Sequence, residues 1–268
     1  MANRLRRASG ADVRAACRRG VWDRPTGGLA AGYVQANLVM LPADLAADFE
    51  DFCRANPRPC PLLERTDVGS VEPREFAPGA DIRTDAPRYR VYVGGELEKA
   101  EPRDVRAHWR GDMVGFLLGC SFTFEAALLQ AGIALRHLEQ GVNVPMYRTS
   151  RACRSVGIFA GPMVVSMRPI PVARVDDARA ITARFPQVHG APIHAGDPAA
   201  LGIADLGQPD WGDAVEIRSG ELPVFWACGV TPQAVAQASR PELMITHAPG
   251  HMFVTDRTDT ELEAHGRT

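Results

Sequence analysis

The sequence has no excess of charge of either sign, and this excludes several kinds of partner. Its 268 residues contain 30 Lys and Arg against 32 Asp and Glu, which gives a formal net charge of −2 and a pI near 6.4. Proteins that hold nucleic acid or anionic lipid through their overall charge carry a positive excess. We therefore expect no nucleic-acid partner.

The sequence also lacks a long apolar run and any closely spaced cysteine pair. The apolar segment 113–118 is soon interrupted by Gly119, Ser121 and Thr123, so no stretch reaches the ~18 residues of a membrane-spanning helix. The arginines near the N-terminus are not followed by the apolar stretch of a signal peptide. The six cysteines are scattered: Cys17, Cys53, Cys60, Cys120, Cys153 and Cys228. These absences predict a cytoplasmic protein with reduced thiols and no membrane partner.

Short apolar segments separated by turn residues predict an α/β fold. The 25 Gly and 21 Pro are spread along the chain, which favours many short elements joined by defined turns. Apolar residues recur at helical spacing in 13–17 and 45–52. Buried strands are expected at 156–167, 222–227, 243–246 and 252–255. Further helices are expected to begin near Asp176, Asp197 and Thr231.

Two other segments carry local signals. Residues 90–98 alternate around Gly94-Gly95, which predicts a β-hairpin. Residues 112–130 are apolar at helical spacing but interrupted at 119–121, which predicts two helical pieces that meet at a sharp turn.

The segment 119–125 would place reactive side chains at the start of a helix. Free N–H groups and the helix dipole favour an oxyanion there, so Ser121 is a candidate to hold one, with simple capping as the structural alternative. Cys120 and Cys228 are candidate thiolate nucleophiles, although a buried inert cysteine is the commoner case. Glu125 is a candidate to orient a histidine, or to act as a base if burial raises its pKa.

Polar side chains also gather between residues 137 and 148. The segment contains His137, Glu139, Asn143, Tyr147 and Arg148. Such a density of polar groups in loop and strand-end sequence is more often functional than structural. We expect Asn143, Tyr147 and Arg148 to contact a substrate.

Arginines are the candidates for binding a substrate carboxylate. Arg168 follows Ser166 at the end of an apolar strand, a place where side chains enter a crevice. A guanidinium can bind a carboxylate through two parallel hydrogen bonds. Arg168 is the first candidate, with Ser166 beside it, and Arg148 and Arg184 are the next.

Four histidines occur in two pairs, His189 with His194 and His247 with His251. Each pair encloses Pro and Gly, which excludes the helical H-E-x-x-H zinc motif. Loop histidines can still meet around zinc or iron together with a carboxylate. We expect no cofactor, and a divalent metal on these four histidines is the alternative.

Several longer phrases point together to one family. They are Gln35–Leu38, Phe52–Leu63, Gly119–Phe122, Asn143–Arg148, Gly161–Pro169, Arg184–His194, Gly196–Pro198, Pro223–Pro232 and Thr246–Met252. They resemble the family of hydro-lyases that includes the D-glutamate cyclases, and the resemblance extends over residues 10–256.

The resemblance implies both a fold and an activity. The fold is α/β, with mixed sheets and flanking helices in two intertwined lobes that form a single catalytic unit over residues 1–268. The activity is that of a carbon–oxygen hydro-lyase of the EC 4.2.1 type. In the best-described case, D-glutamate and 5-oxo-D-proline interconvert with loss or gain of water.

The roles of individual residues follow from this chemistry. One histidine of the first pair would take the amine proton, and one of the second pair would protonate the leaving oxygen. Arg168 or Arg148 would clamp the α-carboxylate of the small-molecule substrate, and Ser121 would hold the oxyanion.

Two other classes of function remain open. One is a metal-dependent hydratase or hydrolase of a small organic acid, and the other is a non-catalytic protein that binds such an acid. The concentration of His, Cys, Arg and acidic residues in loops favours the enzyme. A homo-oligomer is expected from the frequency of such assemblies.

Overall fold

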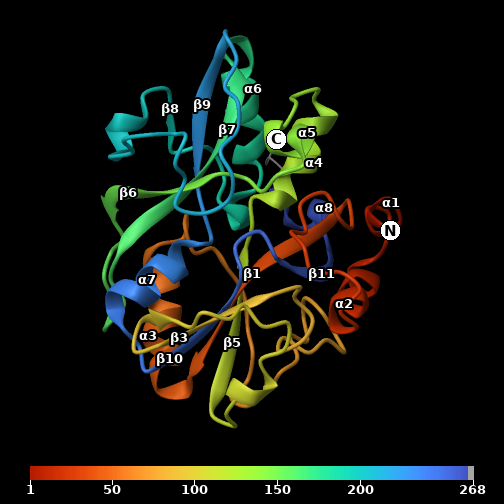
Figure 1. Cartoon of the computed structure of the whole chain (residues 1–268), viewed down its shortest axis with the longest axis vertical. Helices are drawn as coiled ribbons and strands as arrows, with labels where there is room; N and C mark the ends of the chain where they lie inside the picture. The colour runs from red at the N-terminus through yellow and green to blue at the C-terminus, as the bar shows by residue number, and fades with distance from the viewer. Residues whose placement is uncertain (265–268) are drawn as a thin grey trace.

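Two β-sheets, one above the other in Figure 1, organise the part of the chain that the computed structural model describes, residues 1–264. The larger sheet has the strand order β2-β5-β1-β10-β3-β4, and β11 also pairs with β1. Its strands are β1 (Tyr33–Pro42), β2 (Leu62–Arg65), β3 (Tyr89–Val93), β4 (Glu96–Leu97), β5 (Met113–Gly119), β10 (Leu243–His247) and β11 (Phe253–Thr258). The smaller sheet, β6-β7-β9-β8, contains β6 (Met146–Ala152), β7 (Pro162–Pro171), β8 (His194–Ala195) and β9 (Glu221–Ala227).

The expected α/β class with flanking helices is confirmed, but the sheets are not mixed. Every strand pairing among residues 1–264 is antiparallel. Antiparallel strands need no helical crossover between neighbours. In this chain the helices between strands therefore do not connect parallel neighbours in a sheet, as the alternation of strands and helices could suggest.

Helices cover both sheets. The α-helices of residues 1–264 are α1 (Ala2–Leu5), α2 (Gly10–Arg18), α3 (Ala43–Ala55), α4 (Phe122–Gln130), α5 (Arg136–Gln140), α6 (Val175–Ala183), α7 (Thr231–Ser239) and α8 (Asp259–Leu262). Short 3-10 helices are η1 (Arg106–His108), η2 (Val172–Arg174), η3 (Pro186–Val188) and η4 (Pro198–Leu201). None of the helices in this described part is long and apolar enough to cross a membrane.

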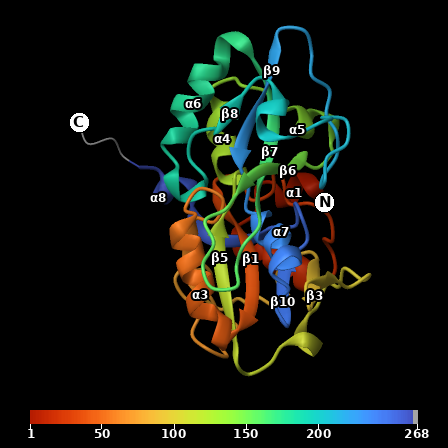
Figure 2. The ribbon, with the colours of Figure 1, turned by 90° about the vertical axis from the view of Figure 1, so that its left-hand side faces the viewer.

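The path of the chain brings the two sheets together at one junction. After β5 the chain leaves the larger sheet, forms α4, α5 and the smaller sheet, and returns through α7 to β10. In Figure 2, α4 and α6 lie beside the smaller sheet and α3 lies beside the larger one. Helix α4 contacts both β1 and α6, and α7 contacts β7. The end of β5 and the start of α7 therefore meet between the sheets.

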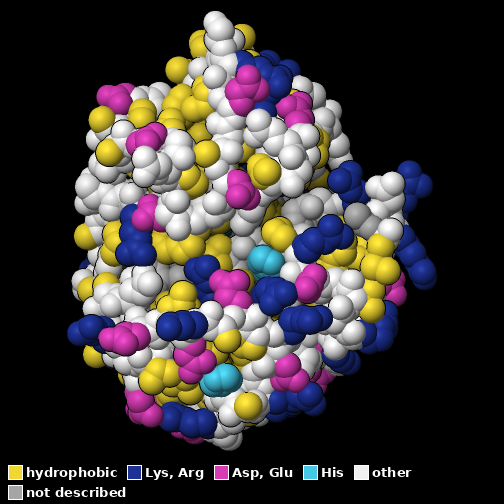
Figure 3. All heavy atoms as spheres, viewed as in Figure 1, with side chains coloured by type: hydrophobic (Ala, Val, Ile, Leu, Met, Phe, Trp, Pro, Cys, Tyr) yellow, Lys and Arg dark blue, Asp and Glu magenta, His cyan; other side chains and the backbone are white. Residues whose placement is uncertain are grey.

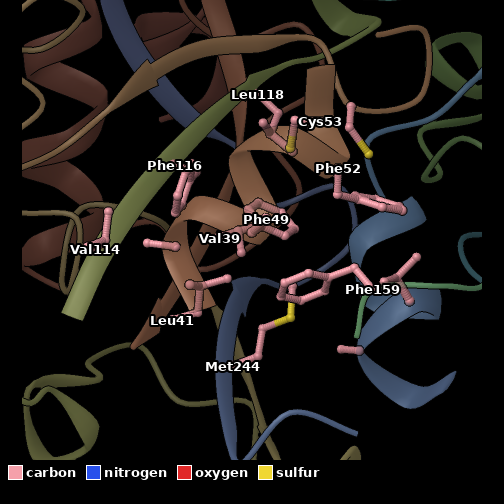
Figure 4. Packing of buried hydrophobic residues seen from close by; sticks show 14 of the residues in the cluster. Val39, Leu41, Phe49, Phe52, Cys53, Val114, Phe116, Leu118, Phe159 and Met244 are labelled. Carbon is pink, nitrogen blue, oxygen red and sulfur yellow. The ribbon is translucent and has the colours of Figure 1, made fainter. Parts of the chain in front are cut away.

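Aromatic side chains form the core between α3 and the larger sheet. In Figure 4, Phe49 of α3 lies among Phe116, Phe159 and Met244. Its ring meets those of Phe116 and Phe159 edge-on, with centroid distances of 5.0 and 5.2 Å. Edge-to-face pairs at such distances add to the free energy that burial alone provides.

Most of the predicted elements are confirmed. These are the hairpin of β3 and β4, the helices α2, α3, α6 and α7, and the strands β9, β10 and β11. At Asp197 the side chain accepts a hydrogen bond from the Ala199 N–H as expected, but only a 3-10 helix follows. The strand expected at 156–167 begins later, at Pro162, because 156–161 form a turn.

The expectation for residues 112–130 is wrong in its first half. Residues 113–119 form β5, and only the second piece, α4, is helical. Every residue of β5 is buried, so the segment is apolar on both faces and lacks the alternation of a half-buried strand. A short run that is apolar throughout gives the same signal for strand and helix. β1 was not predicted either. Nine of its ten residues are buried, the polar Gln35 and Asn37 among them, so it too lacks the alternation of a half-buried strand.

Shortening Phe49 to alanine should destabilise the protein by about 3–5 kcal/mol, because it removes a fully buried ring and leaves a cavity in a packed core. Urea unfolding followed by circular dichroism measures this change. The control is Val172→Ala at a side chain that is 57% exposed, which should cost less than about 0.5 kcal/mol. Equal effects of the two substitutions would contradict the packing described here.

Candidate functional site

A buried ion pair lies at the junction of the two sheets. Arg168 of β7 is fully buried. Its Nε and Nη2 atoms donate to the Oε1 atom of Glu125 on α4, with an Nε–Oε1 distance of 3.0 Å. Two buried charges can remain ionised only when each is paired and hydrogen-bonded. The pair therefore fixes α4 against the smaller sheet.

The remaining sides of the Arg168 guanidinium are also occupied. Its Nη1 donates to the Ser166 hydroxyl at 3.1 Å, and its Nη2 donates to the Ser121 hydroxyl at 3.0 Å. The rings of Phe124 and Trp226 lie 5.5 Å from it. A substrate carboxylate would have to displace Glu125 to bind here. Ser121 stands before α4 as expected, but its side chain forms no cap hydrogen bond. Its hydroxyl accepts from Arg168 and keeps its own O–H as a donor, so its role as an oxyanion donor stays a prediction.

His137 is the second partner of Glu125. Its Nε2 atom lies 3.2 Å from Oε1 of Glu125, which is within the distance of an ion pair. The two atoms are not aligned as a hydrogen bond. The imidazole stacks on Phe122 with centroids 6.3 Å apart. Burial raises the pKa of Glu125, but the charges of His137 and Arg168 outweigh it, so the net shift is downward. Glu125 is thus held as an anion beside the His137 ring.

His137 lines a pocket of about 390 Å³, which we call the His137 pocket. Other residues of its wall are Arg6, Trp22, Arg24, Phe122, Leu138, Asn143 and Asp213. Pockets for small molecules start at ~300 Å³. Neither Arg6 nor Arg24 forms an ion pair with any residue of the described range 1–264, and Arg24 stacks on Trp22 at 4.6 Å. The pocket therefore offers two free guanidinium groups and one imidazole.

Asn143 holds its place in this wall through a contact with the loop before β11. Its Nδ2 donates to the Pro249 carbonyl at 3.2 Å, and a Cβ atom at Gly250 would lie 2.4 Å from its Oδ1. That Oδ1 is buried and has no donor. It can accept a hydrogen bond from a ligand. On the face drawn in Figure 3, Lys and Arg side chains lie interspersed with Asp and Glu side chains over the lower part of the molecule.

The structure does not favour a thiolate nucleophile. Cys120 and Cys228 lie in the same buried cluster. Burial raises the pKa of both thiols, to about 11 at Cys228 and further at Cys120. Both sulfurs are therefore protonated near neutral pH, and a protonated thiol is a poor nucleophile.

The four candidate histidines do not converge. His189 lies near Arg168, with its Nδ1 2.6 Å from the Arg58 carbonyl, whereas His194 stands on β8 near the Asp197 carbonyl. His247 is the last residue of β10 and lies beside Leu38, and His251 is in the loop after that strand. Within residues 1–264, no three His, Cys, Asp or Glu side chains form a group that could hold a metal. The alternative metal site on these histidines is therefore not formed.

The other predicted substrate contacts lie apart from this junction. Arg148 and Tyr147 line a separate pocket. Arg148 forms an ion pair with Asp210 at 3.3 Å, and the Tyr147 hydroxyl donates to the Leu206 carbonyl. Arg184 is at the surface, 3.1 Å from Glu263.

Five of the other predicted residues therefore lie around the Arg168 guanidinium: Cys120, Ser121, Glu125, Ser166 and His189. His137 was noted in its polar segment but was not chosen as a catalytic candidate. Arg6 and Arg24 were not identified, because a surface arginine near the N-terminus has no distinguishing sequence signal. Both arginines reach the pocket because the N-terminal segment lies beside α5 in the folded chain.

Replacing Arg168 by methionine should destabilise the protein by about 3–5 kcal/mol, because the buried Glu125 carboxylate loses both guanidinium hydrogen bonds and the charge that they carry. Unfolding in urea measures the loss. The double variant Arg168→Met with Glu125→Gln should recover part of it, since no charge then remains buried. A double variant whose loss equals the sum of the single losses would show that the two groups are not coupled.

Two buried histidines should make the protein sensitive to acid. Burial lowers the pKa of His189 to about 4 and that of His247 to about 3, from an ordinary value of 6.5. The native state then binds fewer protons than the unfolded state, so its stability is complete above pH 6.5 and falls as the pH drops. His247→Asn keeps an acceptor for the Leu38 N–H and should flatten this slope, measured as unfolding midpoints between pH 7 and 4. The control Val172→Ala, at an exposed side chain without a titratable group, should leave the slope unchanged.

Comparison with known proteins gives a consistent set of similarities. A family model described as D-glutamate cyclase matches residues 114–256. A protein of Stutzerimonas stutzeri named "Putative hydro-lyase" is 61% identical over 254 residues, which cover 95% of this chain and 96% of that protein. One of the same name from Rubrobacter xylanophilus is 62% identical over 253 residues, or 94% and 97% of the two chains.

One solved structure has a weak overall likeness. It is a nitrogen repressor-like protein from Methanococcus jannaschii, matched with a TM-score of 0.37 and 8% identity over 94% of this chain and 99% of that one. Nothing about ligands or assembly is transferred from a likeness of this size.

Proposed function

Because the chain belongs to the D-glutamate cyclase family of hydro-lyases, we propose that it interconverts D-glutamate and 5-oxo-D-proline with loss or gain of water. The observation that carries the proposal is the buried Glu125–His137 pair in the wall of the His137 pocket. A carboxylate that supports a histidine is a common arrangement for moving protons.

The reaction requires protons to move from nitrogen to oxygen. Ring closure forms a bond between the amine nitrogen and the side-chain carboxyl carbon and breaks one carbon–oxygen bond. The ammonium loses two protons as it becomes an amide N–H, and the leaving oxygen gains two as it becomes water. No proton is gained or lost overall, so one group that first accepts and then donates can serve the whole reaction.

His137 is positioned for this exchange. It takes a proton from the ammonium, which leaves a nucleophilic amine, and later returns a proton to the leaving oxygen. Glu125, 3.2 Å from Nε2, stabilises the intermediate imidazolium. The chain's one lysine, Lys99, is not part of the wall of the His137 pocket.

The arginines and Asn143 account for binding. Arg6 and Arg24 are free to hold the two carboxylates of glutamate, and a guanidinium also stabilises the oxyanion of the tetrahedral intermediate. The unpaired Oδ1 of Asn143 accepts from the ammonium. Enclosure of a folded glutamate supplies much of the rate, because the attack is intramolecular.

The proposal is tested by incubating EDTA-treated protein separately with D-glutamate, L-glutamate and 5-oxo-D-proline, and following the products by chiral chromatography. We expect conversion of the D-pair alone. His137→Gln should reduce kcat by about 10²–10⁴-fold, whereas His108→Gln, a histidine beside Glu98 outside the pocket, should stay within about twofold of the parent.

Other outcomes separate the alternatives. Conversion only after divalent ions are restored would favour the metal-dependent hydratase or hydrolase. Binding of these acids without any turnover would favour a non-catalytic binding protein. Unchanged kcat in a folded His137→Gln variant would remove His137 from the mechanism.

A further inference from the structure

A second pocket lies on the other side of Phe122 and Leu138. It has a volume of about 360 Å³ and shares these two residues and Arg6 with the His137 pocket. Its wall includes the loop 28–32, Gln35 of β1, Glu125 of α4 and Asp259 of α8. We call it the Asp259 pocket.

Gln35 presents an acceptor without a donor to this region. The side chain is 3% exposed, and its Nε2 donates to the carbonyl oxygens of Thr26 and Leu29 at 3.1 and 3.2 Å. These two bonds fix the orientation of the amide, because a reversed amide would place its oxygen against two carbonyls. Oε1 is buried and unpaired.

Asp259 presents a second unpaired acceptor. Its backbone N–H donates to the Gly32 carbonyl, but its Oδ1 is buried without a donor. Burial raises the pKa of this carboxyl to about 7. No residue of the range 1–264 forms an ion pair with it. Buried acceptors are normally satisfied, so two in one wall point to a donor supplied from outside.

The cations of the same wall stand near its mouth. Arg6 and Arg7 are exposed, and neither is in an ion pair with a residue of the described chain. An ammonium group brings three donors and one positive charge, which matches the two inner acceptors. A carboxylate on the same molecule matches Arg7, which lines this pocket and not the His137 pocket.

We propose that the Asp259 pocket is a second ligand site that takes a short amino acid, with its ammonium at Gln35 and Asp259 and its carboxylate at Arg7. The bound ammonium also approaches Glu125, which lines this pocket while its partner His137 lines the other. Occupancy should therefore lower turnover, because a second cation weakens the support that Glu125 gives His137. That last consequence rests on the proposed function, whereas the binding itself does not.

The test is isothermal titration calorimetry with 4-aminobutyrate, and with butyrate and n-butylamine, each of which lacks one of the two charged groups. We expect 4-aminobutyrate to bind at least tenfold more tightly than either. Asp259→Asn keeps the shape of the side chain and removes the charge, and it should weaken binding at least tenfold. Asp176→Asn, at an exposed carboxylate of α6, is the matched control and should bind like the parent.

His137→Gln distinguishes the two pockets. Retained binding of 4-aminobutyrate in this variant, with loss in Asp259→Asn, supports the proposal even if D-glutamate is not turned over. Loss in His137→Gln with unchanged binding in Asp259→Asn would place the ligand in the His137 pocket and overturn it. No binding by the parent protein, or equal binding of all three compounds, would overturn it as well. Circular dichroism of each variant confirms that the chain is folded.

Discussion

The ion pair between Arg168 and Glu125 sets the geometry of the junction between the sheets. Arg168 belongs to the smaller sheet, and Glu125 belongs to the helix that follows β5 of the larger one. A buried pair of this kind is strongly disfavoured unless both partners keep their positions. Glu125 in turn is the carboxylate that lies beside His137. His137 lines one of the two pockets at this junction, and Glu125 lines the other. One electrostatic requirement therefore links the packing of the sheets to the placement of the polar groups.

Glycines allow the segments at this junction to approach closely. A Cβ atom at Gly119 would lie 2.0 Å from the Gln187 carbonyl oxygen, and one at Gly229 would lie 1.9 Å from the Asn37 side chain. These positions are the end of β5 and the turn before α7, where the chain leaves and re-enters the larger sheet. A larger side chain at either point would separate the two sheets and so move Arg168 away from Glu125.

The parts of the fold that the sequence predicted are those governed by local signals. The Gly94-Gly95 turn and the Thr231-Pro232 helix start act within a few residues, and the structure confirms them. The strand β5 was misassigned because it is buried on both faces, so its sequence lacks the alternation of apolar and polar residues that marks a half-buried strand. The centre around Arg168 was predicted only as a set of candidate residues. Its pairing with Glu125, 43 positions away, satisfies a buried charge, and no local pattern encodes which carboxylate will do so. The candidate histidines failed to converge for a related reason, since loop positions are fixed by tertiary contacts.

The choice among the buried histidines follows from what surrounds each of them when it is protonated. A buried imidazole accepts a proton readily only where the new charge is compensated. His189 faces the positive charge of Arg168, and His247 faces His251 and Arg90. In both cases burial lowers the pKa of the histidine and these neighbours lower it further, so protonation of the ring is disfavoured. His137 instead lies 3.2 Å from a carboxylate, Glu125, whose pKa is held down by the charges of His137 itself and of Arg168. Arg168, which is enclosed by internal partners, thus contributes to the proposed chemistry indirectly. Together with His137 it holds the pKa of Glu125 below its usual value, and Glu125 is the carboxylate beside the histidine that we propose moves the protons.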